Sequence, residues 1–364
     1  MATTFVQSSY FRRPYVLTSE ARSIAVNTDE SKLTVSLTCD GDTFFSVDLY
    51  AYDGKVELFD PGSIIEDYFI AHQLICQQVS FQFGPASKLL TFLYCENVMP
   101  ESFDPAEILL LSSQARRVHM DSSFTIAALP VTDLTDEQSA SFIIKAVGHD
   151  NSGNIASRSL RMSRNLSNST YTTFTVKEIV SKALEPFAVV GPNQPLPLRD
   201  VKYFSVEYDG RQLMCYITPA PAYLTFQFRN IFNVLELLDV EGSMVTKSET
   251  SRQSAKCAGD LVQYDRHTDR TYQFTTGPLP ADEVESLTQL VASHSVQLLA
   301  DGSYYDIIID DHTCENSTED DSLSVVKFTW RFKGSRPVRF NSALFGIQPS
   351  NRGIFSDEYS PEYE

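Results

Sequence analysis

One loop of the chain carries the residue types of a hydrolase. His149 and Asp150 are adjacent, and Ser152 follows two residues later. A histidine base, a carboxylate that orients it and a hydroxyl nucleophile make a catalytic triad, but adjacent residues of one loop rarely reach the required geometry. The sequence also lacks the Gly-x-Ser-x-Gly pattern of hydrolase nucleophile elbows. We interpret the segment as a polar turn. A hydrolase that uses His149 and Asp150, or a pair of acidic residues, is a third alternative.

Acidic residues are concentrated near His312 and Cys314. Calcium requires several hard oxygen ligands, but the spacing here does not match the Asp-x-Asp-x-Asp-Gly loop with its distal glutamate. One histidine and one cysteine also fall short of a soft-metal site. We interpret the segment as a solvated loop after the apolar strand 307–309 and predict no metal site. The acidic residues are Asp306, Asp310, Asp311, Glu315, Glu319, Asp320 and Asp321.

The sequence motifs of cofactor binding are missing. The chain contains no Gly-x-Gly-x-x-Gly, no Walker loop and no His-Glu-x-x-His. A glycosidase needs two carboxylates about 5–9 Å apart, but such pairs arise by chance among 47 acidic residues. The sequence therefore predicts no catalytic residue, no cofactor and no enzyme activity.

One local run of positive charge lies near the C-terminal end of an acidic chain. The 29 Lys and Arg residues against 47 Asp and Glu residues give a formal charge of −18. A field of this sign repels phosphates and anionic lipids, so we expect binding to neither nucleic acid nor membranes. A nucleic-acid-binding stripe is one alternative for the run, but we interpret it as the solvent-facing side of a strand and its following loop, or as one side of a subunit interface. Its residues are Lys327, Arg331, Lys333, Arg336 and Arg339.

In the C-terminal peptide 351–364, aromatic residues recur among acidic ones. Phe355, Tyr359 and Tyr363 recur at a spacing of four. Aromatic side chains are good interface anchors, so Phe355 and Tyr359 are candidates to dock into a neighbouring chain. The alternative is a frayed terminus.

The remaining sequence is typical of β-structure. Residues Val326, Phe328, Trp330 and Phe332 alternate with polar residues, as in a half-buried strand. Helical stripes are predicted around 64–74, over 176–184 and from about Pro280 onward. Four Asp-Gly pairs favour hairpin turns because both residues tolerate positive φ. These pairs are Asp40-Gly41, Asp53-Gly54, Asp209-Gly210 and Asp301-Gly302.

Proline and glycine residues that interrupt regular structure predict two domains and a tail. Three prolines and a glycine within residues 191–197 interrupt regular structure and are typical of a linker. We predict a mainly β fold with two β-sandwich or β-barrel-like domains, 1–190 and 191–340, a few accessory helices, and an extended tail at 341–364. We expect no signal peptide and no membrane span. The six scattered cysteines indicate reduced thiols of a protein made in the cytoplasm.

Part of the C-terminal half resembles β-rich phage tail-tip and baseplate proteins. The residues that carry the resemblance, within about 224–339, are the segment 271–280, a helix through Glu283 and Leu290, the step 293–296 and the strand 327–332. The resemblance implies a structural virion protein that builds rings with itself and with other tail proteins, and it implies no catalytic residues.

The leading expectation is therefore a non-enzymatic component of a phage tail or baseplate. It would be synthesised in the host cytoplasm, join the virion through protein–protein contacts and form a homo-oligomer. The alternative is a β-sandwich that binds a glycan or receptor, with exposed tyrosines stacked on sugar rings.

Overall fold

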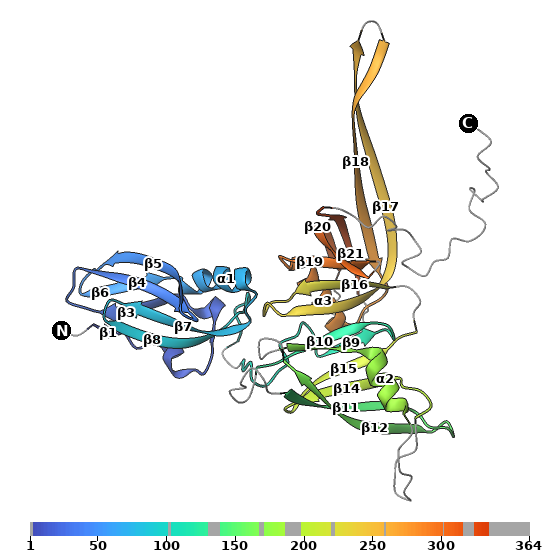
Figure 1. The fold of residues 1–364 in the computed structure, drawn as a ribbon, viewed down its shortest axis with the longest axis horizontal. Helices are drawn as coiled ribbons and strands as arrows, with labels where there is room; N and C mark the ends of the chain where they lie inside the picture. Colours follow the sequence, from blue (N-terminus) through green and yellow to red (C-terminus); the bar gives the residue numbers. More distant parts are fainter. Residues whose placement is uncertain are drawn as a thin grey trace, which may run out of the picture.

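The computed structural model describes residues 3–100, 103–129, 139–166, 171–185, 198–219, 223–257, 260–300, 302–315 and 324–334. These residues form five sheets and three α-helices, arranged in three units (Figure 1). Within these ranges no helix has the length and apolar character needed to cross a bilayer. The prediction of a mainly β fold with a few helices is confirmed.

The N-terminal unit consists of two mainly antiparallel sheets around one core. The strands alternate buried and exposed residues, as in 32–39, and the Asp40-Gly41 turn has positive φ at both residues. Its larger sheet has the order β2 (Val16–Leu17), β8 (Ala86–Leu93), β7 (Cys76–Phe83), β4 (Lys32–Cys39), β5 (Asp42–Tyr50). The smaller sheet has the order β1 (Thr4–Phe5), β3 (Ser23–Asn27), β6 (Lys55–Phe59). Helix α1 (Pro61–His72) buries Ile65 and Phe69 in the core of the unit, which also contains the short 3-10 helices η1 (Ser9–Arg12) and η2 (Thr18–Glu20).

The middle unit is built on a five-stranded sheet. The predicted domain boundary at 190/191 falls inside this unit, because strand 203–208 pairs with strand 139–149. The sheet order is β12 (Ile155–Asn165), β11 (Ser139–His149), β14 (Tyr203–Tyr208), β15 (Arg211–Ile217), β9 (Ala115–Val118). A two-stranded sheet of β10 (Ser123–Ala127) and β13 (Tyr171–Thr175) and the helix α2 (Val176–Leu184) complete the unit.

The C-terminal unit is a closed six-stranded barrel. Trp330 and Phe328 are buried in its core, as their alternation predicts. Helix α3 (Ala281–Ala292) buries Val284, Leu287 and Leu290 against the same core. The barrel order is β16 (Tyr223–Arg229), β17 (Leu235–Cys257), β18 (Asp260–Thr276), β21 (Val325–Phe332), β20 (Ser303–Glu315), β19 (Val296–Ala300).

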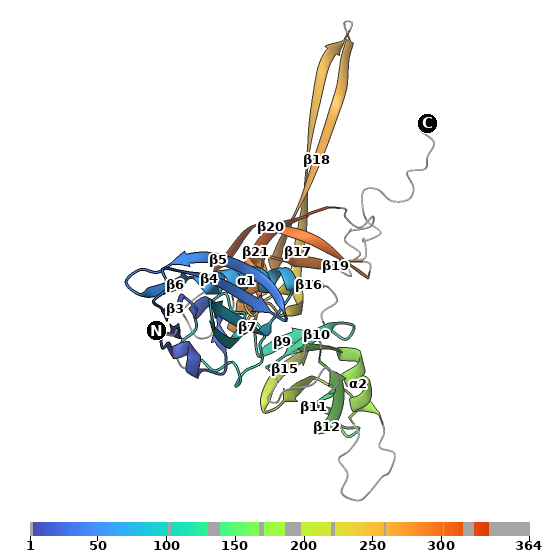
Figure 2. The same cartoon turned by 60° about the vertical axis from the view of Figure 1, so that its left-hand side comes forward.

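Two strands of the barrel continue far beyond it. Strands β17 and β18 stay paired as a two-stranded ribbon that projects away from all three units in both views (Figures 1 and 2). The predicted helices correspond to α1, α2 and α3. The predicted linker 191–197 and the tail 341–364 lie outside the described residues.

Candidate assembly interface

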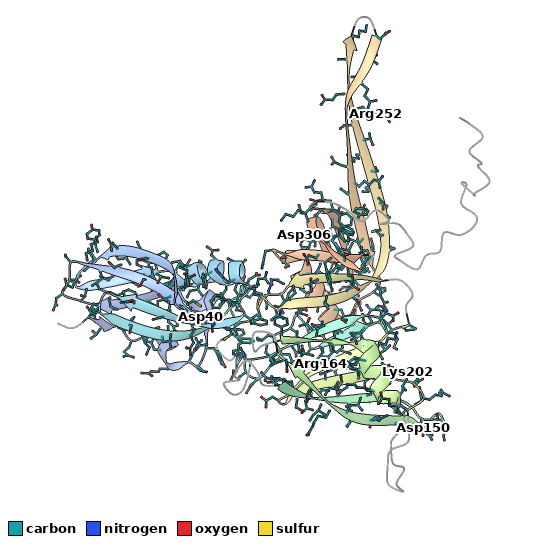
Figure 3. The ribbon with its side chains drawn as sticks, viewed as in Figure 1. Asp40, Asp150, Arg164, Lys202, Arg252 and Asp306 are labelled. Carbon is teal, nitrogen blue, oxygen red and sulfur yellow. The ribbon has the colours of Figure 1, made fainter. Side chains whose placement is uncertain are left out.

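The projecting ribbon, which we call the hairpin, comprises residues 245–257 of β17 and 260–271 of β18. Every residue from Val245 to Lys256 is exposed, so this stretch of β17 has no buried face. The two strands are paired in register from Val245–Gln273 outward, with one irregularity between Gln253 and Ser254. Figure 3 shows Arg252 on the hairpin, well away from the barrel residue Asp306.

A ribbon of this kind is poorly stabilised by its own contacts. An isolated two-stranded hairpin in water is at best marginally stable, because it buries little apolar surface. One cross-strand pair also places like charges directly opposite each other, which is unfavourable. Glu249 faces Asp269 in the register. The hairpin is therefore a segment that a further strand or surface would stabilise.

The two long edges of the hairpin have different charges. By sequence, residues 245–257 contain Lys247, Arg252 and Lys256 against Glu249, so 3 − 1 gives +2. Residues 260–271 contain three aspartates and two arginines, so 2 − 3 gives −1. In the described part of the chain no other strand pairs with either edge beyond the barrel. Open edges with unpaired N–H and C=O groups accept additional strands.

A glycine stands where the hairpin leaves the barrel. Gly242 lies opposite Thr276 in the β17–β18 register. A Cβ atom at this position would lie 2.3 Å from the Thr275 carbonyl oxygen and 2.7 Å from the ring of Phe274. The two strands therefore approach too closely at this point for any side chain, and the root of the hairpin is tightly packed.

Behind the hairpin, a buried ion pair joins the barrel to the middle unit. Glu236 at the start of β17 is fully buried, and its Oε2 lies 2.7 Å from Nη2 of Arg116 on β9, which is 2% exposed. Glu236 Oε1 also accepts hydrogen bonds from the backbone N–H of Ser112 and from Asn230 Nδ2, both at 2.6 Å. The carboxylate therefore keeps its charge in the interior only because several donors surround it.

A second, half-buried set of charges continues the same junction. Arg117 on β9 donates to both carboxylate oxygens of Glu283 on α3, at 2.6–2.9 Å, and to Glu241 on β17 at 3.3 Å. Burial acts to lower the pKa of Arg117, but these two glutamates raise it overall above the usual arginine value. Burial raises the pKa of the neighbouring Asp239 carboxyl.

The turn between β16 and β17 touches all three units. Asn233, at a positive φ of 58° that asparagine tolerates, donates to the carbonyl oxygens of Phe69 and Leu74 in the N-terminal unit at 3.2 and 2.8 Å. Asn230 donates to Leu110 O in the middle unit at 3.0 Å. Because β17 begins at Leu235, two residues after Asn233, these hydrogen bonds anchor the start of the strand to the other two units.

The structure places two of the predicted interface residues on the outside of the barrel. Lys327 and Arg331 both lie on the exposed face of β21, and Arg331 forms an ion pair with Asp310 at 3.0 Å. The alternation that predicted a wet face for this strand is confirmed. Their role at an interface stays a prediction. The other candidates, Arg336, Arg339, Phe355 and Tyr359, lie outside the described residues.

The loop of the hydrolase-like residues has another arrangement. Asp150 Oδ1 accepts hydrogen bonds from the backbone N–H groups of Ser152 and Asn154, both at 2.8 Å, which closes a turn. His149 Nδ1 lies 3.1 Å from Asp200, a residue of the following segment. Backbone hydrogen bonding from His149 lowers the pKa of Asp200 to about 2. Asp150 therefore shapes the loop, and Asp200 is the carboxylate beside the histidine.

The acidic segment around His312 was predicted as a solvated loop, but as far as Glu315 it is part of strand β20. Asp306 accepts a hydrogen bond from Gln297 at 2.8 Å, and Asp310 is paired with Arg331. Among the residues that the structure describes, no three His, Cys, Asp or Glu side chains are grouped closely enough to hold a metal ion. The second part of the segment, 316–323, lies outside them.

Neither the hairpin nor the junction was predicted from the sequence. Residues 235–240 read Leu-Glu-Leu-Leu-Asp-Val, and Glu236 shares a face with the buried Leu238 and Val240. A glutamate on the apolar face of a strand was the available signal for a buried charge pair. The length of the hairpin had no comparable signal, because its polar residues resemble those of a loop.

Comparisons with known proteins show no family for this chain. No family model matches it, and no curated protein matches it. Among solved structures, the FN1–FN3 domains of chicken CNTN1 match at 9% identity over 78% of this chain and 90% of that chain, with a TM-score of 0.15. The native conformation of E. coli alpha-2-macroglobulin matches at 9% identity over 83% of this chain and 21% of that chain, also with a TM-score of 0.15. At these TM-scores neither likeness carries an argument about fold or function.

Proposed function

We propose that this chain is a structural component of a phage tail or baseplate, which assembles through protein–protein contacts and has no enzymatic role. The observation that carries the proposal is the hairpin, a long ribbon in which residues 245–256 of β17 are all exposed and whose strand β17 starts at a buried junction. A partner strand on each edge supplies the stabilisation that the hairpin lacks on its own. The chain is made in the host cytoplasm and becomes part of the virion.

The contact that fits the hairpin best is with other copies of itself. When two hairpins point the same way, β17 of one copy lies beside β18 of the next, and the two strands run antiparallel. This pairing also brings the basic edge of one copy to the acidic edge of its neighbour, which favours the heterologous contact over a symmetric one. Repeated heterologous contacts close into a ring when the rotation between copies allows it.

The dimensions of the hairpin are sufficient for such a contact. The 12 exposed residues from Val245 to Lys256 extend about 40 Å at ~3.3 Å per residue. A stable interface buries roughly 1,000 Å² or more in total, so we expect the barrels to contribute additional contact area. Lys327 and Arg331 on the outer face of β21 are candidates for that contribution.

The test compares the full chain with a variant whose hairpin is shortened. Residues 247–271 are replaced by an Asn-Gly turn, which leaves the barrel strands and the junction intact. We expect the full chain to form a discrete oligomer by light scattering, to appear as rings in negative stain and to join purified tail components, whereas the shortened variant stays monomeric with unchanged Trp330 fluorescence. A strictly monomeric full chain that never joins tail components would contradict the proposal.

A second candidate function is binding of a glycan or receptor. It is favoured by Tyr50 and Tyr52 near the end of β5, which are 74% and 88% exposed. Exposed tyrosine rings can stack on sugar rings, and the apolar ring with a polar tip suits such a surface. A glycan array separates the two candidates. A glycan-binding protein shows selective binding that Tyr52→Ala removes, whereas an assembly protein without this role shows no selective binding.

A further inference from the structure

The middle unit has a long open sheet edge that is separate from the hairpin. Strand β12 is the outermost strand of the five-stranded sheet and pairs with β11 over its full 11 residues, from Ile155 to Asn165. In the ranges that the structure describes, no strand pairs with its other side (Figure 1). Such an edge presents a row of unpaired N–H and C=O groups that accept an added strand.

The charges of β12 indicate what kind of strand it accepts. The strand contains Arg158, Arg161 and Arg164 and no acidic residue. Arg158 donates to the carbonyl oxygen of Ala183 at 2.9 Å, and Arg164 forms an ion pair with Glu178. Pairing of two β12 strands from two copies would bring six arginines together. An acidic strand is therefore favoured over a second β12.

Arg161 lies on the face of the sheet that α2 does not cover. It is exposed between two exposed serines, Ser159 and Ser163, and it lies opposite Ile143 of β11, which is 41% exposed. The small side chains of Ser159 and Ser163 leave room on both sides of the guanidinium group, and Ile143 places an apolar side chain beside it on the same face. This surface suits a strand that presents a carboxylate between two aromatic rings.

The C-terminal segment of the chain has this pattern. Residues 351–364 contain four acidic residues and one arginine, a net charge of −3. In an extended strand Phe355, Asp357 and Tyr359 fall on one face, because side chains alternate with a period of two. The 20 residues 335–354 separate this segment from the end of the barrel, a distance of up to about 70 Å when extended.

We propose that the C-terminal segment adds to the edge of β12 as an antiparallel strand, with Asp357 opposite Arg161. In this register Phe355 lies opposite Ser163 and Tyr359 lies opposite Ser159. The carboxylate then pairs with the arginine, the two rings flank it on the open face, and the backbone groups of the edge are paired. The proposal does not depend on the hairpin contact or on the proposed function.

A cysteine pair in the full chain tests this register. In a background with Cys257 and Cys314 changed to serine, Ser159→Cys is combined with Tyr359→Cys. The matched control combines Ser159→Cys with Ser360→Cys, which points to the other face. We expect the first pair to form a disulfide about tenfold faster than the control, because a one-residue shift moves the side chain to the opposite face. Cross-linked protein of monomer mass indicates docking within one chain, and cross-linked protein of dimer mass indicates docking between copies.

A charge exchange provides the second test. Arg161→Asp should slow disulfide formation between positions 159 and 359, and the additional change Asp357→Arg should restore it, since the double change returns opposite charges to the pair. Arg22→Asp, at an exposed position of the N-terminal unit, should leave the rate unchanged. Equal rates of disulfide formation for positions 359 and 360 would overturn the proposal. A rate that does not change with the charge exchange would also overturn it. The hairpin-shortened variant should keep the cross-link.

Discussion

Replacing Glu236 by leucine is expected to destabilise the barrel and its junction strongly. The change removes the carboxylate that faces Arg116 at 2.7 Å, while the arginine stays 2% exposed and cannot reach water. Leaving one partner of a buried ion pair uncompensated costs about 3–5 kcal/mol. It also leaves the Ser112 backbone N–H and Asn230 Nδ2 without their 2.6 Å acceptor. For a unit of roughly 100 residues, where 1 kcal/mol shifts Tm by about 4–8 °C, the free-energy change corresponds to a drop in Tm of about 12–40 °C.

Trp330 makes this prediction easy to measure. It is the only tryptophan of the chain and is fully buried in the barrel core. Thermal unfolding followed by its fluorescence therefore reports on the barrel rather than on the other units. Glu249→Leu, at an exposed position opposite Asp269 in the hairpin, is the matched control and should change Tm little.

The double variant Arg116→Met with Glu236→Leu tests the cause. Removing both charges should recover most of the about 3–5 kcal/mol lost in Glu236→Leu, because no unpaired buried charge remains. If Glu236→Leu lowered Tm by less than about 2 °C, or if the double variant were no more stable than Glu236→Leu, the reasoning about the junction would be refuted.

Two further predictions concern the hairpin root and pH. Gly242→Ala should lower the Tm reported by Trp330, since the new Cβ would lie 2.3 Å from the Thr275 carbonyl oxygen. Its control is Gly277→Ala, which should have a small effect on Tm because a Cβ at this position meets nothing within 4 Å. Asp200 has its pKa lowered to about 2 in the folded chain, so its stabilising contribution is present above the usual aspartate pKa of about 3.9 and is lost as pH falls toward 2. Asp200→Asn should therefore lower the free energy of unfolding at pH 7, as measured by urea denaturation. The variant should also lose less of this free energy than the wild type between pH 4 and pH 2. An unchanged pH dependence would contradict the lowered pKa of Asp200.

The parts of the fold that depend on local sequence could be predicted. The buried alternation of β21 and the helices α1, α2 and α3 follow from periodicity over a few residues, and the Asp40-Gly41 and Asp209-Gly210 turns follow from residues that tolerate positive φ. The sheet partner of β11 could not be predicted in the same way. Strand β14 lies about 60 residues further along the chain and beyond the proline-rich segment that predicted a boundary.

The junction and the hairpin illustrate two different limits. Arg116 and Glu236 are 120 residues apart, and one sequence holds no information about which of 29 basic and 47 acidic residues meet. The hairpin was missed because residues 245–257 have no apolar face, and apolar periodicity is the signal that identifies strands. The same lack of a buried face is the reason for proposing that the hairpin needs a partner.

The most direct test of self-assembly through the hairpin is a mixing experiment with two charge variants. One variant carries Lys247→Glu, Arg252→Glu and Lys256→Glu, so both of its edges are acidic; the other carries Asp260→Lys and Asp269→Lys, so both of its edges are basic. Light scattering should find each variant monomeric alone, because like edges repel, and should find the oligomer restored when the two are mixed, because each contact then joins an acidic to a basic edge. Oligomers of either variant alone at the wild-type mass, or a mixture that stays monomeric while the wild type assembles, would contradict the account.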